Sequence, residues 1–285
     1  MKLESIIKEK FVKINDITLH TIFAGTDSGK PLILLHGFPD FWYGWNNIIK
    51  GLKDDFFLIV PDLRGYNLSD KPEGVKNYTL DVLVDDVKHL CETLGINNVN
   101  LAGHDWGGII AWAFGEKYPN LLNKLIILNA PHPKVFRKKI EKDSSQRRAS
   151  GYIKELIKPN SEALLKQNNY QMLQFSVFGT ARKRDAFDAK DKEKYLEAWS
   201  QEKALDRSAN YYRANRRYEE WTGIIKVPTL VIHGMKDNFI KPTVLDGLEE
   251  YVGDLKIVKS PKSSHWIMHD DPEIVISSIK KFMHF

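Results

Sequence analysis

The residues on either side of Asp105 indicate that it occupies the position of a catalytic nucleophile. It lies in the run 103–108, with the sequence GHDWGG, between apolar segments 99–102 and 109–118 that predict a buried strand and a helix. A side chain on such a sharp strand-to-helix turn, a nucleophile elbow, is presented at the edge of a sheet. The glycines two residues before and after Asp105 suit the strained backbone and a close approach of helix to strand. The alternative is that Asp105 only caps the helix.

A carboxylate at this position indicates a different chemistry from that of a serine. Asp105 would attack a saturated, electrophilic carbon, displacing a halide or opening an epoxide, and would leave a covalent ester for water to hydrolyse. A serine would instead indicate acyl transfer. The residue type therefore predicts the ester intermediate and leaves halide and epoxide substrates both open.

Two residues that follow later predicted strands could complete the site. Asp237 ends the turn after one strand, and His265 lies in the loop after the next. Because Asp105 is already ionised, we expect His265, oriented by Asp237, to deprotonate the water that attacks the ester. His269 is an alternative base, and Asp237 could instead form a local turn.

The loop 36–39, with the sequence HGFP, also follows a predicted strand. We expect the backbone N–H groups of Phe38 and Trp106 to stabilise the negative charge on the ester carbonyl oxygen when water attacks. A Gly and Pro pair after a strand is often only a turn, but its position before the elbow favours the oxyanion role. Nucleophile, acid and histidine occur in the chain order of α/β-hydrolases.

The elements that must position these residues alternate between strands and helices. Asn15 and Asp16 separate two alternating runs and predict a hairpin at the start of the fold. Short apolar runs separated by helical patterns then predict buried parallel strands with crossovers. The fold class is therefore α/β, with a mostly parallel eight-stranded sheet and helices on both faces. The predicted strands are 11–14, 17–24, 31–35, 56–61, 99–102, 125–129, 227–233 and 255–258, and the predicted helices include 80–94 and 109–118.

Strand-like runs vanish between residues 132 and 221, where charged amphipathic helices predominate. We predict a helical cap subdomain, 132–221, inserted into a core domain formed by 1–131 and 222–285. The cap holds 21 Lys and Arg against 13 Asp and Glu, whereas the whole chain has a net charge of +5. Since no nucleic-acid motif interleaves with these charges, we expect no nucleic-acid partner. Attraction of anionic substrates is a weaker alternative.

Composition also bears on location and cofactors. No stretch approaches the roughly 20 apolar residues of a membrane span, and residues 1–10 lack an apolar signal region, so we expect a cytoplasmic protein with no membrane partner.

No cluster has the spacing of metal ligands, and neither a metal nor an organic cofactor is expected. The lone cysteine, Cys91, is predicted to be a buried thiol without a function. A monomer and a homodimer both remain open.

Five motifs together resemble the epoxide hydrolases of the α/β-hydrolase fold, most closely the small soluble bacterial members. The resemblance spans nearly the whole chain and implies that an apolar epoxide and water give a vicinal diol. The elbow is shared with haloalkane and haloacetate dehalogenases, which are the alternative. Arg64 is expected to be structural. The motifs are HGFPD (36–40), DLRGY (62–66), SDKP (69–72), the elbow (103–108) and APHP (130–133).

The resemblance also implies two cap tyrosines that donate hydrogen bonds to the epoxide oxygen. Tyr212 matches the second of them and Tyr152 fits the first, with Tyr170 as its rival, although any one could serve only in interhelical packing. Phe38 stands where haloalkane dehalogenases commonly carry a halide-binding Asn, and the cap lacks the His and Trp pair of the haloacetate enzymes. The residues expected to line an apolar pocket are Trp42, Trp45, Phe175 and Phe178.

Overall fold

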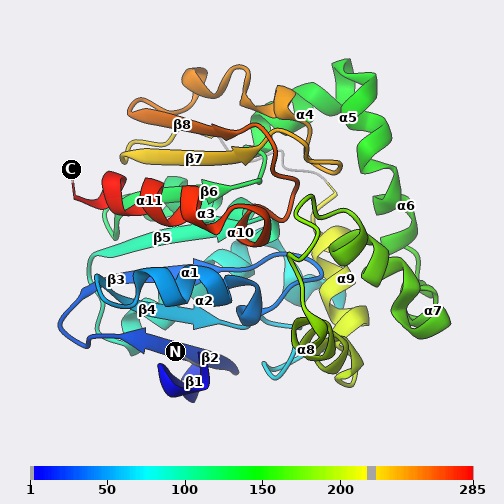
Figure 1. Cartoon of the computed structure of the whole chain (residues 1–285), viewed down its shortest axis with the longest axis horizontal. Helices are drawn as coiled ribbons and strands as arrows, with labels where there is room; N and C mark the ends of the chain where they lie inside the picture. The colour runs from blue at the N-terminus through cyan, green and yellow to red at the C-terminus, as the bar shows by residue number, and fades with distance from the viewer. Residues whose placement is uncertain (1–2, 217–222, 285) are drawn as a thin grey trace.

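One mixed sheet runs through the molecule, with helices on both of its faces (Figure 1). The computed structural model describes residues 3–216 and 223–284. The strand order across the sheet is β1-β2-β4-β3-β5-β6-β7-β8, which confirms the predicted eight-stranded α/β fold. The strands are β1 (Ile7–Ile14), β2 (Ile17–Gly25), β3 (Lys30–Leu35), β4 (Phe56–Pro61), β5 (Val99–His104), β6 (Leu122–Leu128), β7 (Thr229–Gly234) and β8 (Leu255–Ser260).

The first two strands form the antiparallel part of the sheet. They pair from Ile14 opposite Ile17 to Ile7 opposite Ala24, with Asn15 in the left-handed backbone region at φ +46°. β2 pairs with β4 in the antiparallel sense, and all later pairs are parallel. β1 begins four residues before its predicted start because its charged first half is an exposed edge, which no hydrophobic alternation marks.

Helices cover both faces of the sheet. α1 and α11 pack together on one face, while α2 and α3 pack together on the other (Figure 1). The Asp271 side chain accepts a hydrogen bond from the Ile274 N–H and caps α11, with Pro272 at its first position. The core helices are α1 (Asn46–Leu52), α2 (Leu80–Thr93), α3 (Trp106–Lys117), α10 (Ile267–Asp270) and α11 (Pro272–Met283), and the short ones are η1 (Leu3–Ser5), η2 (Trp42–Trp45), η3 (Val75–Tyr78), η6 (Pro242–Leu245) and η7 (Leu248–Glu250).

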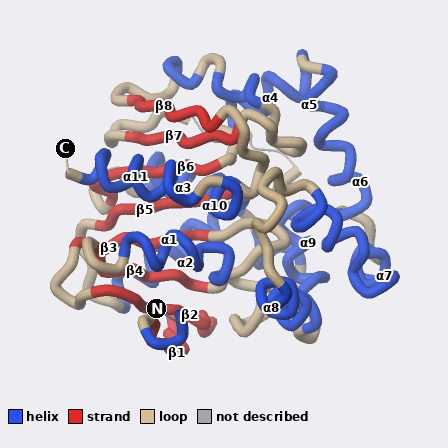
Figure 2. The backbone as a smooth tube through the Cα atoms, viewed as in Figure 1, coloured by secondary structure: helices blue, strands red, loops and turns tan. Residues whose placement is uncertain are grey.

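The regular elements between residues 133 and 214, which follow β6, are all helices, and we call residues 133–214 the helical insert. It lies beyond the carboxyl ends of the parallel strands (Figures 1 and 2). The predicted boundary between cap and core, residues 221 and 222, lies outside the described residues. The elements of the insert are α4 (Pro133–Lys142), α5 (Ser144–Ala149), η4 (Ser150–Tyr152), α6 (Ile153–Leu156), α7 (Ser161–Gln174), η5 (Phe175–Gly179), α8 (Ala189–Ser200) and α9 (Ala204–Ala214).

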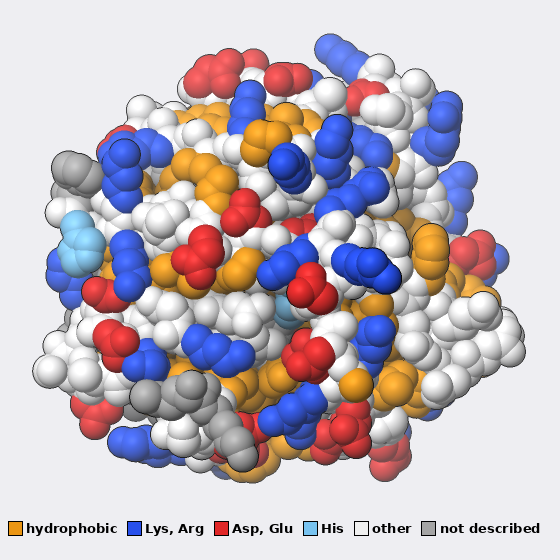
Figure 3. All heavy atoms as spheres, in the orientation of Figure 1, with side chains coloured by type: hydrophobic (Ala, Val, Ile, Leu, Met, Phe, Trp, Pro, Cys, Tyr) orange, Lys and Arg blue, Asp and Glu red, His pale blue; other side chains and the backbone are white. Residues whose placement is uncertain are grey.

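The surface carries charges of both signs. Lys and Arg side chains alternate with Asp and Glu over the face shown in Figure 3. In the part of the chain that the structure describes, none of the helices is both long and apolar enough to cross a bilayer. Cys91 is buried on α2, as predicted.

Candidate active site

Asp105 occupies a strained backbone position between β5 and α3. Its φ is +50° and its ψ is −120°, a combination that costs free energy for a residue with a side chain. A Cβ on Gly103 would lie 2.2 Å from the Gly107 carbonyl oxygen, and one on Gly107 would lie 2.2 Å from the Leu35 carbonyl oxygen. The two glycines are therefore required for the close approach of helix to strand. α3 starts at Trp106, three residues before its predicted start, because the strand ends directly at the elbow.

The Asp105 carboxylate is held by backbone donors. Its Oδ1 accepts a hydrogen bond from the Phe38 N–H at 2.8 Å, and the Trp106 N–H also bonds to the carboxylate. A Cβ on Gly37 would lie 2.3 Å from the Asp105 Cβ, so this glycine lets the loop approach the elbow. Burial raises the pKa of Asp105, and the His265 charge and the two N–H groups oppose that shift only in part. A desolvated carboxylate of raised pKa is a stronger nucleophile.

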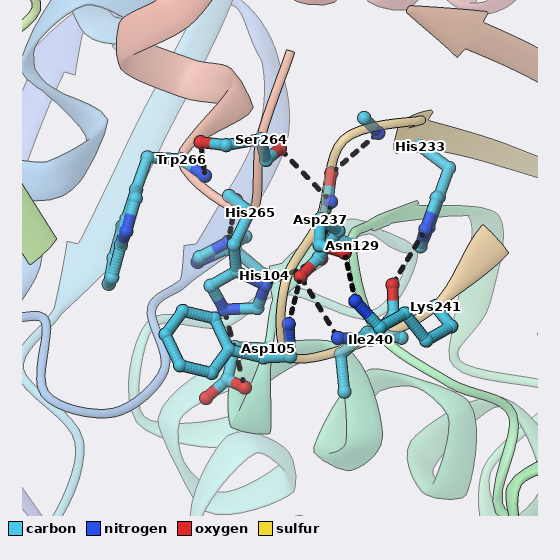
Figure 4. A network of polar contacts seen from close by, with 12 residues as sticks. His104, Asp105, Asn129, His233, Asp237, Ile240, Lys241, Ser264, His265 and Trp266 are labelled. Carbon is cyan, nitrogen blue, oxygen red and sulfur yellow. Dashed lines mark hydrogen bonds and ion pairs between the residues drawn. The ribbon is translucent and has the colours of Figure 1, made fainter. Parts of the chain in front are cut away.

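His265 lies between the two carboxylates, as Figure 4 shows. Its Nδ1 is 2.8 Å from Asp237 Oδ2 and its Nε2 is 3.6 Å from Asp105 Oδ2. Since an ionised carboxylate only accepts hydrogen bonds, Nδ1 carries the proton and the Nε2 of a neutral imidazole is free of one. Burial favours the neutral ring, but the charge and hydrogen bond of Asp237, together with Asp105, outweigh burial and raise the pKa of His265.

Asp237 is a fully satisfied buried carboxylate. Its Oδ1 accepts hydrogen bonds from the Phe239 and Ile240 N–H groups at 2.7 and 2.9 Å, and its Oδ2 accepts one from Asn129 Nδ2 at 2.7 Å. Although burial acts in the opposite direction, the charge and hydrogen bond of His265, together with the Asn129 hydrogen bond, lower the pKa of Asp237 to about 2. The carboxylate is therefore ionised at neutral pH and can orient His265.

Sequence reasoning missed Asn129, which joins the carboxyl ends of two strands. Its Oδ1 also accepts a hydrogen bond from the Gly234 N–H at 3.1 Å, and its backbone is left-handed at φ +43°. An asparagine directly after a buried strand was the available signal, because this residue type tolerates that backbone region.

The other candidate histidines lie away from the carboxylate of Asp105. His269 is buried against the Phe187 ring, with centroids 4.1 Å apart, and burial lowers its pKa to about 3. His233 lies within β7, and its Nε2 is 3.1 Å from the Ile240 carbonyl oxygen. Neither takes the place of His265 beside Asp105.

Two cavities meet at the elbow and share three lining residues, Asp105, Tyr152 and Tyr212. The larger measures about 730 Å³ and extends under α4 and α6, and the smaller measures about 310 Å³ and has a mostly apolar wall. Both are of the size of small-molecule sites. Burial raises the pKa of Tyr212 well above its ordinary value, so its hydroxyl stays protonated and can donate a hydrogen bond.

The structure distinguishes the two candidates for the first tyrosine by position. The rings of Tyr152 and Tyr212 lie 6.2 Å apart at a steep angle. Tyr170 packs against the Trp199 ring, with centroids 6.1 Å apart, and is not among the residues that line the two cavities. Tyr152 therefore lies in the wall of the cavities that contain Asp105, and its role as the first tyrosine stays a prediction.

The structure places the four residues expected to line an apolar pocket in different surroundings. Phe175 lines the smaller cavity, with 68% of its surface still exposed. The expectation is wrong for Trp45, which is fully buried in the core, and for Trp42, which packs against Phe41 and Tyr43. Phe178 is not among the residues that line the two cavities at the elbow, and its ring packs against Phe187, Tyr195 and Trp199 in the helical insert. An aromatic residue near a site in sequence can equally turn into the core.

Metal-binding geometry is not found in the described ranges 3–216 and 223–284, where no three His, Cys, Asp or Glu side chains gather to hold an ion.

Comparison with known proteins gives consistent matches along the chain. The sequence pattern of the family described as alpha/beta hydrolase fold matches residues 30–272. The AB hydrolase superfamily protein YfhM of Bacillus subtilis is 39% identical over 281 residues, which cover 97% of this chain and 98% of that protein. Epoxide hydrolase 1 of Caenorhabditis elegans is 33% identical over 96% of this chain and 70% of its own length.

Solved structures agree with these relatives. A mutant epoxide hydrolase from Bacillus megaterium superimposes with a TM-score of 0.91 at 32% identity, covering 97% of this chain and all of that one. The same enzyme in complex with an inhibitor gives a TM-score of 0.90 with the same coverage. The similarity is therefore close in fold and extends over both the sheet and the helical insert.

Proposed function

The chain belongs to the alpha/beta hydrolase fold family, with epoxide hydrolases among its full-length relatives, and we propose that it hydrolyses an epoxide to a vicinal diol. The observation that carries the proposal is the wall common to the two cavities, where the Asp105 carboxylate lies beside Tyr152 and Tyr212. A nucleophile and two hydroxyl donors around one space suit the opening of a ring whose oxygen must gain a proton.

The first step forms an ester on Asp105. Its Oδ2 attacks a ring carbon, the bond from that carbon to the ring oxygen breaks, and the oxygen takes the electron pair. Tyr152 and Tyr212 donate hydrogen bonds to this oxygen, and one of them supplies its proton. Oδ1 remains on the Phe38 N–H and becomes the ester carbonyl oxygen.

The second step hydrolyses the ester. His265 Nε2 takes a proton from water, whose oxygen attacks the Asp105 Cγ, and the charge that develops on Oδ1 is stabilised by the Phe38 and Trp106 N–H groups. Asp237 stabilises the imidazolium. Collapse of the intermediate breaks the Cγ–Oδ2 bond, restores the carboxylate and releases the diol. The two protons of the attacking water, one on His265 and one on the new carboxyl oxygen, pass to the leaving alkoxide and to the tyrosinate.

The helical insert serves in this proposal as a cap over the site. It contributes Tyr152 from η4 and Tyr212 from α9, whereas Asp105, Asp237 and His265 come from the sheet and its loops. Closing of the helical insert over the sheet and its loops around a substrate would exclude bulk water from the ester.

A dehalogenase with the same Asp105, His265 and Asp237 is the alternative function. Release of a halide needs no proton, so the paired tyrosines would have no task there. This contrast favours the epoxide.

A panel of mono- and disubstituted epoxides and of alkyl halides tests the proposal, with diol and halide measured separately. We expect diol from at least one epoxide, and its loss in Asp105→Asn, because an amide is a poor nucleophile. Asp81→Asn, a change of an exposed carboxylate on α2, is the matched control. Halide release without diol formation would reject the proposal in favour of the dehalogenase.

A further inference from the structure

The segment that carries the oxyanion donor is irregular, and three consecutive residues of it have different partners. The Phe38 N–H donates to Asp105 Oδ1 at 2.8 Å, the Pro39 carbonyl oxygen accepts a hydrogen bond from Trp199 Nε1 at 2.6 Å, and Asp40 Oδ1 accepts one from the Tyr195 hydroxyl at 2.8 Å. We call residues 37–40 the oxyanion loop. Its donor to the nucleophile and its two contacts with the helical insert are therefore adjacent in sequence.

Both contacts from the insert come from one face of α8. Tyr195 and Trp199 are four residues apart, so they lie one above the other on the helix. Tyr195 is fully buried and Trp199 is 3% exposed. Hydrogen bonds shielded from water in this way fix the positions of their partners more firmly than exposed ones do.

α8 is itself held at its start. Asp188 and Asp191 form a capping box, and Asp191 Oδ1 also accepts a hydrogen bond from the Tyr43 hydroxyl at 2.9 Å. Along the helix, the rings of Phe178 and Phe187 pack against Tyr195 with centroids 5.5 and 5.7 Å away. The helix therefore connects the oxyanion loop to an aromatic cluster of the insert and, through Tyr43, to the core.

We propose that α8 holds the oxyanion loop in its working position, with Trp199 and Tyr195 as positioning residues for hydrolysis of the ester. This inference rests on the proposed function for its kinetic consequence. Neither side chain is among those that line the two cavities at the elbow, and both act through the Phe38 N–H. The insert thereby influences the second step of the reaction as well as the first.

Ester hydrolysis should depend on this N–H more than ester formation does. During attack on the epoxide, negative charge leaves the carboxylate, whereas during hydrolysis a full charge develops on Oδ1 against the Phe38 N–H. An interaction that is strongest in the second transition state accelerates that step. A loosened oxyanion loop should therefore cause the ester to accumulate.

Trp199→Phe and Tyr195→Phe test the proposal, since each removes one hydrogen-bond donor and keeps an aromatic ring. Trp112→Phe is the matched control, because the Trp112 indole N–H is buried without a hydrogen-bond partner within the described residues. Ester formation and decay are followed by rapid quenching and mass spectrometry of the intact protein. Amide hydrogen exchange of peptides covering 37–41 is measured on the same variants without substrate.

We expect ester decay to slow about tenfold in Trp199→Phe and in Tyr195→Phe, while ester formation changes by less than about threefold. Exchange in 37–41 should be faster in both variants and unchanged in Trp112→Phe. Equal slowing of the two steps, or behaviour like that of Trp112→Phe, would overturn the inference. If the wild-type protein forms no diol, the proposed function fails, and unchanged exchange in 37–41 would separately reject the role of α8.

Discussion

His265 Nε2 lies 3.6 Å from Asp105 Oδ2, a separation longer than a hydrogen bond. The Oδ2 atom is therefore not engaged by the imidazole, while Oδ1 is engaged by the Phe38 N–H. The two carboxylate oxygens thus differ in their surroundings. This difference supports one oxygen as the attacking atom and the other as the future ester carbonyl, with His265 close enough to activate a water.

Replacement of His265 should separate the two steps. In His265→Gln we expect the ester to form and persist, with its decay slowed by about 10²- to 10⁴-fold, because a general base is lost while the nucleophile is kept. Mass spectrometry after mixing with an epoxide should show a gain equal to the mass of that epoxide. His89→Gln, on α2 and remote from the site, serves as the control. Decay as fast as in the wild type would contradict the role of His265.

The tyrosines should act on the first step. Tyr152→Phe and Tyr212→Phe are each expected to slow ester formation by about tenfold or more, since the ring oxygen loses a hydrogen-bond donor as its charge develops. Tyr170→Phe should leave that rate unchanged, because Tyr170 packs against Trp199 and is not among the cavity-lining residues. Single-turnover rates of ester formation check this prediction, and a large effect of Tyr170→Phe alone would reverse the assignment.

Of the two steps of the proposed reaction, ester decay should be the one whose rate depends mainly on pH. A base must be neutral, so decay should slow as the pH falls through the pKa of His265, which Asp237 and Asp105 hold above its ordinary value of 6.5 despite burial. In the ester Asp105 carries no charge, and Asp237 becomes the main source of the upward shift. In Asp237→Asn the burial of His265 lowers the pKa of its imidazole without that opposing charge. The acid limb of the pH profile of ester decay should therefore move to lower pH.

Decay of the preformed ester, measured across neutral pH in the wild type and in Asp237→Asn, tests this shift. Asp85→Asn, on the surface of α2, is a suitable control because it removes a carboxylate far from the imidazole. An acid limb that stays in place or moves to higher pH in Asp237→Asn would show that another group controls the profile.

Arg64 is expected to stabilise the fold and to take no part in the chemistry. Its Nε and one terminal nitrogen contact the two Asp86 oxygens at 2.5 Å each, and both side chains are buried. Arg64→Leu should lower the free energy of unfolding by about 3–5 kcal/mol because it leaves Asp86 buried and unpaired. Urea denaturation measures the loss. The double variant Arg64→Leu with Asp86→Leu should recover part of it, and a fully additive loss would contradict the pairing.

Local motifs were sufficient to select the three charged residues of the candidate active site. Asp105 is marked by its glycines and by the change from strand to helix, and Asp237 and His265 by their places after strands. Each of these signals lies within a few residues of the side chain that it marks. Neighbouring parallel strands end at the same edge of the sheet, so residues that follow their carboxyl ends lie close together. The carboxyl ends of β5, β7 and β8 therefore bring the three side chains together.

Packing directions could not be predicted in the same way. Trp42 and Trp45 are aromatic and near Phe38 in sequence, yet neither lines the two cavities at the elbow. Phe178 packs inside the helical insert. The hydrogen bonds of Asn129 to Asp237, and of Trp199 to Pro39, join residues more than a hundred positions apart. Nothing in either local segment specifies such a partner.

The sequence by itself thus determined the fold class, the carboxylate at the elbow and the chain order of the candidate acid and base. Only the tertiary structure decided which tyrosines border the cavities, which aromatic side chains turn inward and which helix contacts the oxyanion loop. The physical reason is that strand and turn patterns depend on neighbouring residues. The relative placement of the insert and the sheet instead depends on many distant contacts formed at once.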